Sequence, residues 1–338
     1  MAWGRVAGLL AVTAGSAAAS RAARAVRARR AEVAAVRPEL RTRRVLPPLS
    51  VTNRSVLRFM RSRPTQTYPL PADVRTRVLE SDLTGSVLYE RHDRTRPSPA
   101  VLWIHGGGTI MGSPAMSEPW CAAVADDLDA LVLSSRYRLA PEHPFPAGFD
   151  DCFAALEWLH ANAADLGVDP TRIAVGGDSA GGGLAASVAQ RAHDTGVPVA
   201  FQCLVYPMVD DRTVLHREQG GRGAFVWRPA SNRFAWESYL GHEVREHEDR
   251  PYAAAARRSD LTGLPPAWIG VGDLDLFYGE DIDYAHRLRA SDVPCDLHIE
   301  PGMYHGADLY MATTDPMRAF RARAMTALRT ALTGAKTS

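Results

Sequence analysis

A serine in a five-residue turn is the residue of this sequence best suited to chemistry. Residues 177–181 read Gly-Asp-Ser-Ala-Gly, which fits the pattern G-x-S-x-G, and they lie between an expected strand and an expected helix. In that setting the glycines allow a sharp turn that holds the Ser179 side chain clear of the backbone, and the helix N-terminus favours developing negative charge. The pattern alone is weak, because small residues are common in tight turns. Its position between a strand and a helix makes Ser179 a candidate nucleophile.

A second motif, His-Gly-Gly-Gly at residues 105–108, follows an earlier expected strand. Successive glycines let backbone N–H groups point at one spot, where side chains would block the approach of an oxyanion. The motif therefore predicts an oxyanion hole, in which His105 fixes the loop rather than acting as a base. The donors that we expect are the N–H groups of Gly107, Gly108 and Ala180, with Gly106 as a further candidate.

A serine hydroxyl is a poor nucleophile near neutral pH, so it needs a base, and the base needs an orienting carboxylate. After a G-x-S-x-G turn the acid and the histidine follow along the chain in that order. One downstream strand ends with two candidate acids, Asp273 and Asp275, and the next strand is followed by His305. His286 and His298 lie within an expected helix and an expected strand, so His305 is the better-placed base. The spacing alone allows either acid.

These residues are spread along a regular alternation of strands and helices. Short apolar runs of the kind buried in a parallel sheet alternate with helical patterns. The expected strands cover residues 86–91, 100–104, 130–134, 173–176, 200–206, 267–272 and 295–299, and the expected helices cover 120–128, 148–161 and 181–192. Such a repeat implies an α/β fold with a mostly parallel central sheet flanked by helices on both faces.

The alternation stops between residues 209 and 250, where five aromatic residues stand among Gly, Arg and Glu. We interpret this stretch as an insertion that forms a helical cap together with part of the N-terminal region. Its aromatic residues either line an acyl pocket or simply pack the cap on the core. The expected division is an Arg-rich tail and part of the cap in residues 1–75 and a catalytic domain in 76–338, with the cap insertion near 210–250.

The composition is that of a soluble globular protein. Of the 338 residues, 46 % are hydrophobic and 23 % are charged, which suffices for a large apolar core. The cysteines lie far apart and form no C-x-x-C pair, so we expect neither a disulfide framework nor a zinc site. They are Cys121, Cys152, Cys203 and Cys295.

The N-terminal region carries a strong charge asymmetry. Residues 1–72 hold fourteen arginines against Glu32 and Glu39, about +12, whereas the whole chain has a net charge of +1. The apolar run from Val6 to Ser20 is shorter than the roughly 18 to 20 residues that span a bilayer, and the arginines after it favour retention in the cytoplasm. Two interpretations stay open for residues 1–45: a helix on an anionic membrane surface, and a helix or frayed tail of the cap. Without aromatic interleaving or a binding motif, nucleic acid is not expected as a partner.

Together these motifs resemble those of the bacterial hormone-sensitive-lipase family of esterases, also called family IV, over about residues 101–307. The likeness rests on the two glycine motifs, on the segment YRLAPEHPFPA at 137–147, on Leu-Pro-Pro at 264–266, and on the settings of Asp275 and His305. The resemblance implies an α/β-hydrolase fold with a helical cap, Asp275 as the acid of a triad, and no metal or cofactor. Gly279 departs from the pattern, since relatives often carry Asp there.

The resemblance also implies a serine carboxylic-ester hydrolase that acts on short- to medium-chain acyl esters of small molecules through an acyl-enzyme. One alternative is an arylamide deacetylase or lactonase, because the same triad does not fix the leaving group. Another is a non-catalytic ligand-binding protein, as in the plant gibberellin receptors, where the triad is broken; here Ser179, Asp275 and His305 are all present. A cytoplasmic location is expected, while contact with a membrane and a homodimer stay open.

Overall fold

The structure is a computed structural model, and it describes residues 23–42, 50–64, 68–81, 83–216 and 219–334. One eight-stranded sheet with the strand order β1-β2-β4-β3-β5-β6-β7-β8 forms its centre. The strands are β1 (Val74–Val78), β2 (Val87–Arg91), β3 (Ser98–Ile104), β4 (Leu131–Ser135), β5 (Val168–Asp178), β6 (Phe201–Val205), β7 (Ala267–Gly272) and β8 (Cys295–Glu300). The two pairs that involve β2 are antiparallel and the other five are parallel. The mostly parallel sheet that the sequence predicts is therefore confirmed.

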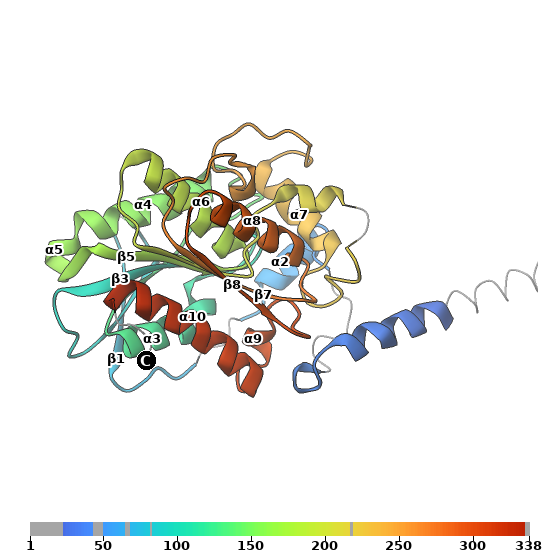
Figure 1. The fold of residues 1–338 in the computed structure, drawn as a ribbon, viewed down its shortest axis with the longest axis horizontal. Coiled ribbons are helices and arrows are strands. Elements are labelled where there is room, and N and C mark those ends of the chain that lie inside the picture. The colour runs from blue at the N-terminus through green and yellow to red at the C-terminus, as the bar shows by residue number, and fades with distance from the viewer. Residues whose placement is uncertain (1–22, 43–49, 65–67, 82, 217–218, 335–338) are drawn as a thin grey trace, which may run out of the picture.

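Helices cover both faces of this sheet (Figure 1). The helices are α2 (Arg54–Arg61), α3 (Glu118–Leu128), α4 (Ala147–Ala161), α5 (Ala163–Leu166), α6 (Ala180–Thr195), α7 (Pro229–Leu240), α8 (Tyr278–Ala290), α9 (Ala307–Tyr310) and α10 (Asp315–Thr333), with 3-10 turns η1 (Pro38–Leu40), η3 (Pro114–Ser117), η4 (Asp211–Leu215) and η5 (Ala255–Arg257). Apolar side chains of α3 and α10 pack on one face, and those of α4, α6 and α8 pack on the other. The result is a three-layer α/β arrangement.

Strand β3 shows why the strands appear in the sequence as continuous apolar runs and not as an alternation of apolar and polar residues. Successive side chains of a strand point to opposite faces of the sheet. Val101 and Trp103 accordingly pack with the α3 and α10 side, whereas Leu102 and Ile104 pack with the α4 and α6 side. Because both faces are covered, every residue of β3 is buried.

Between β6 and β7 the described residues form only helices and loops, chiefly η4, α7 and η5. Helix α7 packs over the same side of the sheet as α6, and α2 contributes to the same apolar cluster. A hydrogen bond of 2.9 Å from the N–H of Val51 to Oγ of Ser231 ties the segment before α2 to α7. The N-terminal region and the 210–250 stretch thus lie together in space.

The described N-terminal residues differ in how they meet the rest of the molecule. Residues 23–35 form a helix that stands out from the globular body (Figure 1). The turn after it packs against the loop that follows β8: the N–H of Arg37 donates to the oxygen of Gly302 (3.1 Å), and the Tyr304 hydroxyl donates to the oxygen of Leu40 (3.2 Å). Arg37 also pairs with Glu300 at 3.0 Å.

No helix in the described part of the chain has both the length and the apolar character needed to cross a membrane. The apolar run from Val6 to Ser20 lies outside the described residues.

Candidate active site

The candidate residues meet at one edge of the sheet because parallel strands place their carboxyl ends together. Residues 105–108 follow β3, Ser179 follows β5, Asp275 follows β7 and His305 follows β8. In open α/β sheets this edge is where ligands bind. The fold therefore brings together residues that lie up to two hundred positions apart in the sequence.

Ser179 occupies the tight turn between β5 and α6. Its φ and ψ are 59° and −121°, a backbone conformation that non-glycine residues rarely adopt. Two hydrogen bonds of 2.9 Å hold it there: its N–H donates to the oxygen of Val205, and its oxygen accepts from the N–H of Met208. A Cβ atom on Gly181 would lie 2.0 Å from the oxygen of Ile104, so the turn can form only with glycine at that position.

A continuous hydrogen-bond chain connects the serine to an imidazole and a carboxylate. Nε2 of His305 lies 2.9 Å from Oγ of Ser179, and its Nδ1 lies 2.8 Å from Oδ2 of Asp275. The other oxygen of Asp275 accepts from the N–H of Phe277 at 2.9 Å, which fixes the carboxylate. All three side chains are buried or nearly so.

Asp273 and Asp275, the two acids that the spacing allows as partners of His305, make different contacts. Asp275 contacts His305, as described above, whereas Oδ1 of Asp273 accepts from the N–H of Gly302 at 2.7 Å. Asp273 therefore stabilises the turn that leads to the histidine loop. Geometry assigns the imidazole contact to Asp275 alone.

Aromatic rings surround the imidazole of His305. The ring of Tyr206 lies 4.7 Å away and that of Phe277 5.1 Å away, both edge to face, and the ring of Trp227 lies at 6.4 Å. Such packing restricts the side chain to one orientation and keeps water away from it. The indole N–H of Trp227 donates to Oδ1 of Asn232 at 3.1 Å, which fixes the tryptophan in turn.

The glycine loop after β3 approaches the serine closely. Gly107 and Gly108 have φ values of 117° and 64°, which favour glycine. A Cβ on Gly107 would lie 2.0 Å from the oxygen of Met111, and one on Gly108 would lie 2.3 Å from the ring of Trp227. Both positions thus need glycine for conformation and for space. Ala180, as the first residue of α6, has an N–H with no partner inside the helix.

His105 has the loop-fixing position that its sequence context suggests. Its Nδ1 lies 2.8 Å from the oxygen of Gly106, its ring stacks on Tyr137 with centroids 4.3 Å apart, and its own oxygen accepts from the Tyr137 hydroxyl at 3.0 Å. Burial lowers the pKa of His105 to about 4. The ring is therefore neutral over the physiological pH range.

A buried polar cluster lies beneath the nucleophile turn, and the sequence motifs give no sign of most of it. Oδ1 of Asp178 accepts from the indole N–H of Trp103 at 3.2 Å. Arg321 of α10 forms an ion pair with Asp308, whose other oxygen accepts from the Tyr206 hydroxyl at 2.7 Å. The side chain of Asp178 is buried as well.

Burial raises the pKa of Asp178 to about 6. The charge of Arg321 opposes that increase, the charge of Asp308 adds to it, and a hydrogen bond from the N–H of Gly106 opposes it. The Gly106 N–H is thus directed at this carboxylate. That partner makes Gly106 a weaker candidate for the oxyanion hole than its two neighbours.

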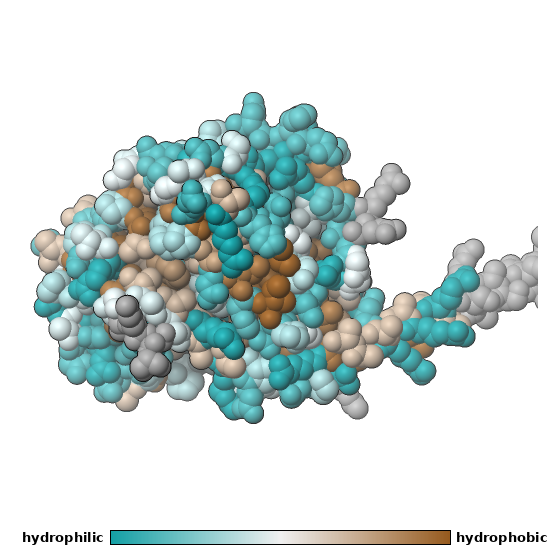
Figure 2. Space-filling model, in the orientation of Figure 1, coloured by the Kyte–Doolittle hydropathy of each residue, from teal (hydrophilic) through white to brown (hydrophobic). Residues whose placement is uncertain are grey.

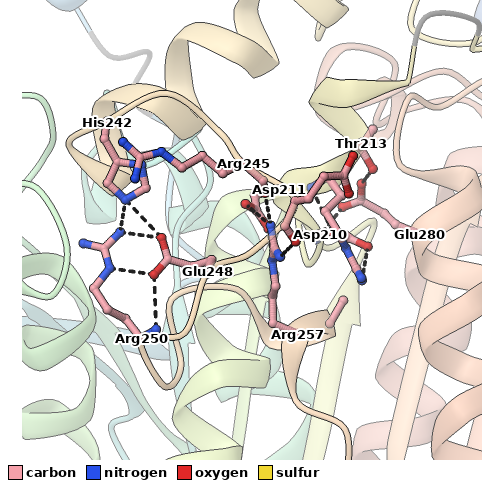
Figure 3. A network of polar contacts seen from close by, with 12 residues as sticks. Asp210, Asp211, Thr213, His242, Arg245, Glu248, Arg250, Arg257 and Glu280 are labelled. Carbon is pink, nitrogen blue, oxygen red and sulfur yellow. Dashed lines mark hydrogen bonds and ion pairs between the residues drawn. The ribbon is translucent and has the colours of Figure 1, made fainter.

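A second polar network ties the 210–257 stretch to the start of α8 (Figure 3). The carboxylate of Glu280 accepts from the N–H of Val209 at 2.8 Å and from the hydroxyl of Thr213. Arg257 makes a two-pronged ion pair with Asp211, both distances being 2.8 Å. Burial raises the pKa of Glu280 well above its usual range. Because Glu280 follows Asp275 by five residues, this network anchors the segment after Asp275 to the 210–257 stretch.

The same figure shows a more exposed part of the network (Figure 3). Nε and one terminal nitrogen of Arg250 each lie 2.7 Å from an oxygen of Glu248, and His242 lies 3.1 Å from the same carboxylate. Arg250 lowers the pKa of Glu248 to about 2. These contacts close the loop that follows α7.

The comparisons with known proteins agree with this geometry. A family model described as an alpha/beta hydrolase fold matches residues 101–309. Carboxylesterase NlhH of Mycobacterium tuberculosis (strain ATCC 25618 / H37Rv) is 39 % identical over 236 residues, which are 69 % of this chain and 74 % of that protein. Esterase LipI of the same strain is 37 % identical over 240 residues, 70 % of this chain and 74 % of that protein. The solved structure of a bacterial heroin esterase is 36 % identical, with a TM-score of 0.77 over 89 % of this chain and 99 % of that one.

The sheet order, the serine turn and these matches define an enzyme of the α/β-hydrolase class. The chain belongs to the α/β-hydrolase family, in its hormone-sensitive-lipase-like branch, and it is a serine carboxylic-ester hydrolase. The family, the fold and the enzyme class that the motifs predict are thereby confirmed. The non-catalytic alternative is set aside.

Proposed function

We propose that Ser179, His305 and Asp275 are the catalytic triad with which this hydrolase cleaves short- to medium-chain acyl esters through an acyl-enzyme. The observation that carries the proposal is the buried hydrogen-bond chain from the serine through the imidazole to the carboxylate, with distances of 2.9 and 2.8 Å. A nucleophile, a base and an orienting acid within hydrogen-bond reach are what serine acyl transfer requires.

In the proposed cycle, Nε2 of His305 takes the proton of Ser179 as Oγ attacks the ester carbonyl. Asp275 holds the imidazole tautomer and stabilises the imidazolium. The tetrahedral intermediate collapses as His305 gives the proton to the leaving alkoxide, which leaves as an alcohol. Water then attacks the acyl-serine with the same histidine as base, and the carboxylic acid and free serine result.

The oxyanion of each tetrahedral intermediate lies, in this proposal, against the N–H groups of Gly107, Gly108 and Ala180. The positive φ values of the two glycines and the unpartnered first N–H of α6 support this assignment. Loss of a single such donor typically costs about 2.7–4 kcal/mol of the activation barrier. The glycine loop thus contributes on the same scale as the triad.

The test is hydrolysis of p-nitrophenyl esters with acyl chains from C2 to C12. We expect turnover of the short and medium esters, a burst of p-nitrophenol, and a loss of several orders of magnitude in Ser179→Ala and His305→Ala. His193→Ala, which removes an exposed histidine outside the site, is the matched control and keeps full activity. An inactive wild type, or a fully active Ser179→Ala, contradicts the proposal.

Matched aryl esters and aryl amides test the choice of leaving group. Nothing in the triad distinguishes an ester from an amide or a lactone. The similarity to a carboxylesterase and an esterase favours esters. Faster hydrolysis of the amide or of a lactone than of the matched ester assigns the chain to the alternative activity.

We also propose that the helix over residues 23–35 contacts an anionic membrane surface. Arg24, Arg27 and Arg30 are exposed, and their spacing of three residues places them on one side of the helix. Figure 2 shows hydrophilic residues along this helix, whose first turns extend beyond the body of the molecule. Its one acidic residue, Glu32, pairs with Arg29 at 2.8 Å. The outward side thus carries three positive charges without a nearby negative one on the same helix.

The middle of the same helix contacts the body of the molecule near the proposed triad. The guanidinium of Arg29 covers the ring of Phe225 at 4.5 Å, and that ring lies 5.5 Å from Tyr304, which precedes His305. A helix bound to a membrane therefore holds the catalytic side of the enzyme near the surface where esters of limited solubility collect.

Co-sedimentation with vesicles tests this contact. We expect binding to phosphatidylglycerol vesicles but not to phosphatidylcholine vesicles. Each arginine should raise the affinity about five-fold, so the replacement of all three by Glu should lower the affinity for phosphatidylglycerol vesicles by at least about 10²-fold. A control triple variant reverses Arg77, Arg245 and Arg323, which are exposed elsewhere. Equal binding by the two triple variants, or equal binding to both vesicles, refutes the contact.

A further inference from the structure

The residues directly after β6 hold the nucleophile turn in place. The oxygen of Val205 accepts from the N–H of Ser179, and the N–H of Met208 donates to the oxygen of Ser179, both at 2.9 Å. The backbone of residues 205–208 is therefore tied to the serine. Tyr206, between these two contacts, has a φ of 36°, a conformation that non-glycine residues rarely adopt and that is enriched at functional sites. This backbone fixes the direction in which the Tyr206 side chain leaves the strand.

The side chain of Tyr206 reaches the other half of the proposed triad. Its ring lies 4.7 Å from the imidazole of His305, edge to face, and its hydroxyl donates to Asp308 at 2.7 Å. Because Asp308 follows His305 by only three residues, this hydrogen bond holds the loop that carries the base. Burial and the charge of Asp308 raise the pKa of Tyr206 well above its usual range, so the hydroxyl keeps its proton and remains a donor.

Asp308 is fixed in turn by α10. Its side chain is fully buried, and its carboxylate forms an ion pair with Arg321. The guanidinium of Arg321 lies over the ring of Trp120 on α3, 4.8 Å from the ring centroid. A carboxylate accepts a stronger hydrogen bond than a neutral oxygen does. The histidine loop is thus held by the layer of α3 and α10 as well as by the end of β6.

We propose that Tyr206 is a positioning residue for the catalytic base: it ties the serine turn to the histidine loop and so keeps Nε2 of His305 within reach of Ser179. The inference rests on the proposed triad and adds Tyr206 and Asp308, neither of which takes part in the bond changes. Nε2 and Oγ lie 2.9 Å apart, within the range that proton transfer requires. A misplacement of reacting groups by about 1 Å can cost about 10²-fold in rate.

The kinetics of Tyr206→Phe test the proposal. We expect kcat on p-nitrophenyl butyrate to fall about 10- to 100-fold while KM stays within about two-fold of the wild-type value. KM stays because the same histidine serves acylation and deacylation, so both steps slow down together. Complete reaction with diethyl p-nitrophenyl phosphate counts the reactive serines, so kcat refers only to folded enzyme. An unchanged kcat per reactive serine overturns the proposal.

Asp308→Ala and the double variant show whether the two residues act through one hydrogen bond. If they do, Asp308→Ala lowers kcat about as much as Tyr206→Phe does, and the double variant falls no further. Losses that multiply in the double variant overturn the link between the two residues. Asp308→Asn keeps an oxygen for the hydroxyl, so we expect a smaller loss than in Asp308→Ala, and a larger loss contradicts the link. This milder variant carries the comparison if Asp308→Ala does not fold.

Tyr284→Phe is the matched control. It removes a buried tyrosine hydroxyl on α8 that accepts from Nε2 of Gln190 at 3.1 Å, a contact separate from those of the triad. We expect kcat per reactive serine to stay at the wild-type level in this variant, although some stability is lost. An equal fall in Tyr284→Phe shows that the loss of any buried hydrogen bond slows the enzyme, which overturns the specific role of Tyr206.

The failures of the two proposals are distinguishable. If the wild type hydrolyses butyrate, Ser179→Ala does not, and Tyr206→Phe keeps the wild-type kcat, the positioning role is wrong and the triad stands. If the wild type does not hydrolyse the ester, or Ser179→Ala hydrolyses it at the wild-type rate, the proposed function fails, and the positioning role fails with it.

Discussion

Replacement of Asp178 by Asn should change how the stability of the protein depends on pH. The cluster beneath the nucleophile turn contains two carboxylates, Asp178 and Asp308, and one guanidinium, Arg321, all buried or nearly so. With both acids ionised the cluster has a net negative charge in an apolar setting. Asp178→Asn imitates the state in which Asp178 carries a proton and the cluster is neutral.

The magnitude follows from the pKa. Burial raises the pKa of Asp178 from its ordinary 3.8 to about 6, which corresponds to about 3 kcal/mol of unfolding free energy. Because the folded protein holds this proton more tightly than the unfolded chain does, the contribution is fully present below about pH 4. It is lost as the pH rises through about 6. The variant, which has no proton to lose there, should therefore gain about 3 kcal/mol relative to the wild type between pH 4 and pH 7.

Urea denaturation of both proteins at several pH values between 4 and 7 measures this difference. The other carboxylates are the same in both proteins, so their contributions cancel when the unfolding free energy of the wild type is subtracted from that of the variant. Asp169→Asn is the control, because hydrogen bonds from Thr171 and Arg172 lower the pKa of Asp169 to about 2, so that this carboxylate titrates below about pH 4 in the folded and the unfolded protein alike. The difference in stability between that variant and the wild type should therefore stay nearly constant from pH 4 to pH 7. A difference between Asp178→Asn and the wild type that does not change with pH refutes the reasoning.

Three further substitutions have clear expected results. Asp275→Asn should lower kcat on p-nitrophenyl butyrate by about 10⁴-fold, because the amide favours the wrong tautomer of His305; a loss below ten-fold argues against this acid. Gly108→Ala places a methyl group 2.3 Å from the ring of Trp227 at a φ of 64°, so kcat should fall by about 10²–10³-fold, and unaltered kcat excludes this loop from the oxyanion hole. Tyr206→Phe removes the 2.7 Å bond to a buried carboxylate and should cost about 1.5–3 kcal/mol in urea denaturation; an unchanged midpoint shows that the bond adds nothing.

Much of the sheet can be predicted from the sequence because its central strands are buried on both faces. Strands such as β3 and β7 admit only apolar or small residues, which leaves a continuous run in the sequence. β1 leaves no such run: its sequence is VRTRV, and only Val74 is buried. This edge strand forms through pairing with β2, so its existence depends on a neighbour rather than on its own pattern.

Some parts of the candidate site can likewise be predicted from the sequence, and others cannot. The serine turn and the glycine loop are local, because steric limits on a few consecutive residues create them. The partner of His305 cannot be chosen locally, because Asp273 and Asp275 lie only two residues apart on one turn. Only the position of His305 in the folded chain shows that Asp275 is the one in contact with it. The pairing of Arg321 with Asp308 joins α10 to the turn of α9, and no spacing rule connects those two residues.

The contacts between the N-terminal turn and the histidine loop set a condition on how the protein is made. Arg37 and Leu40 leave the ribosome well before their partners Glu300 and Tyr304, which follow 263 and 264 residues later. At about 5–20 residues per second, synthesis keeps them waiting roughly 13 to 50 seconds. During that time Leu40, which is buried in the finished enzyme, lacks the hydrogen bond that the Tyr304 hydroxyl donates to its oxygen. The loop that carries His305 thus completes its contacts with this turn only after residue 304 has been made.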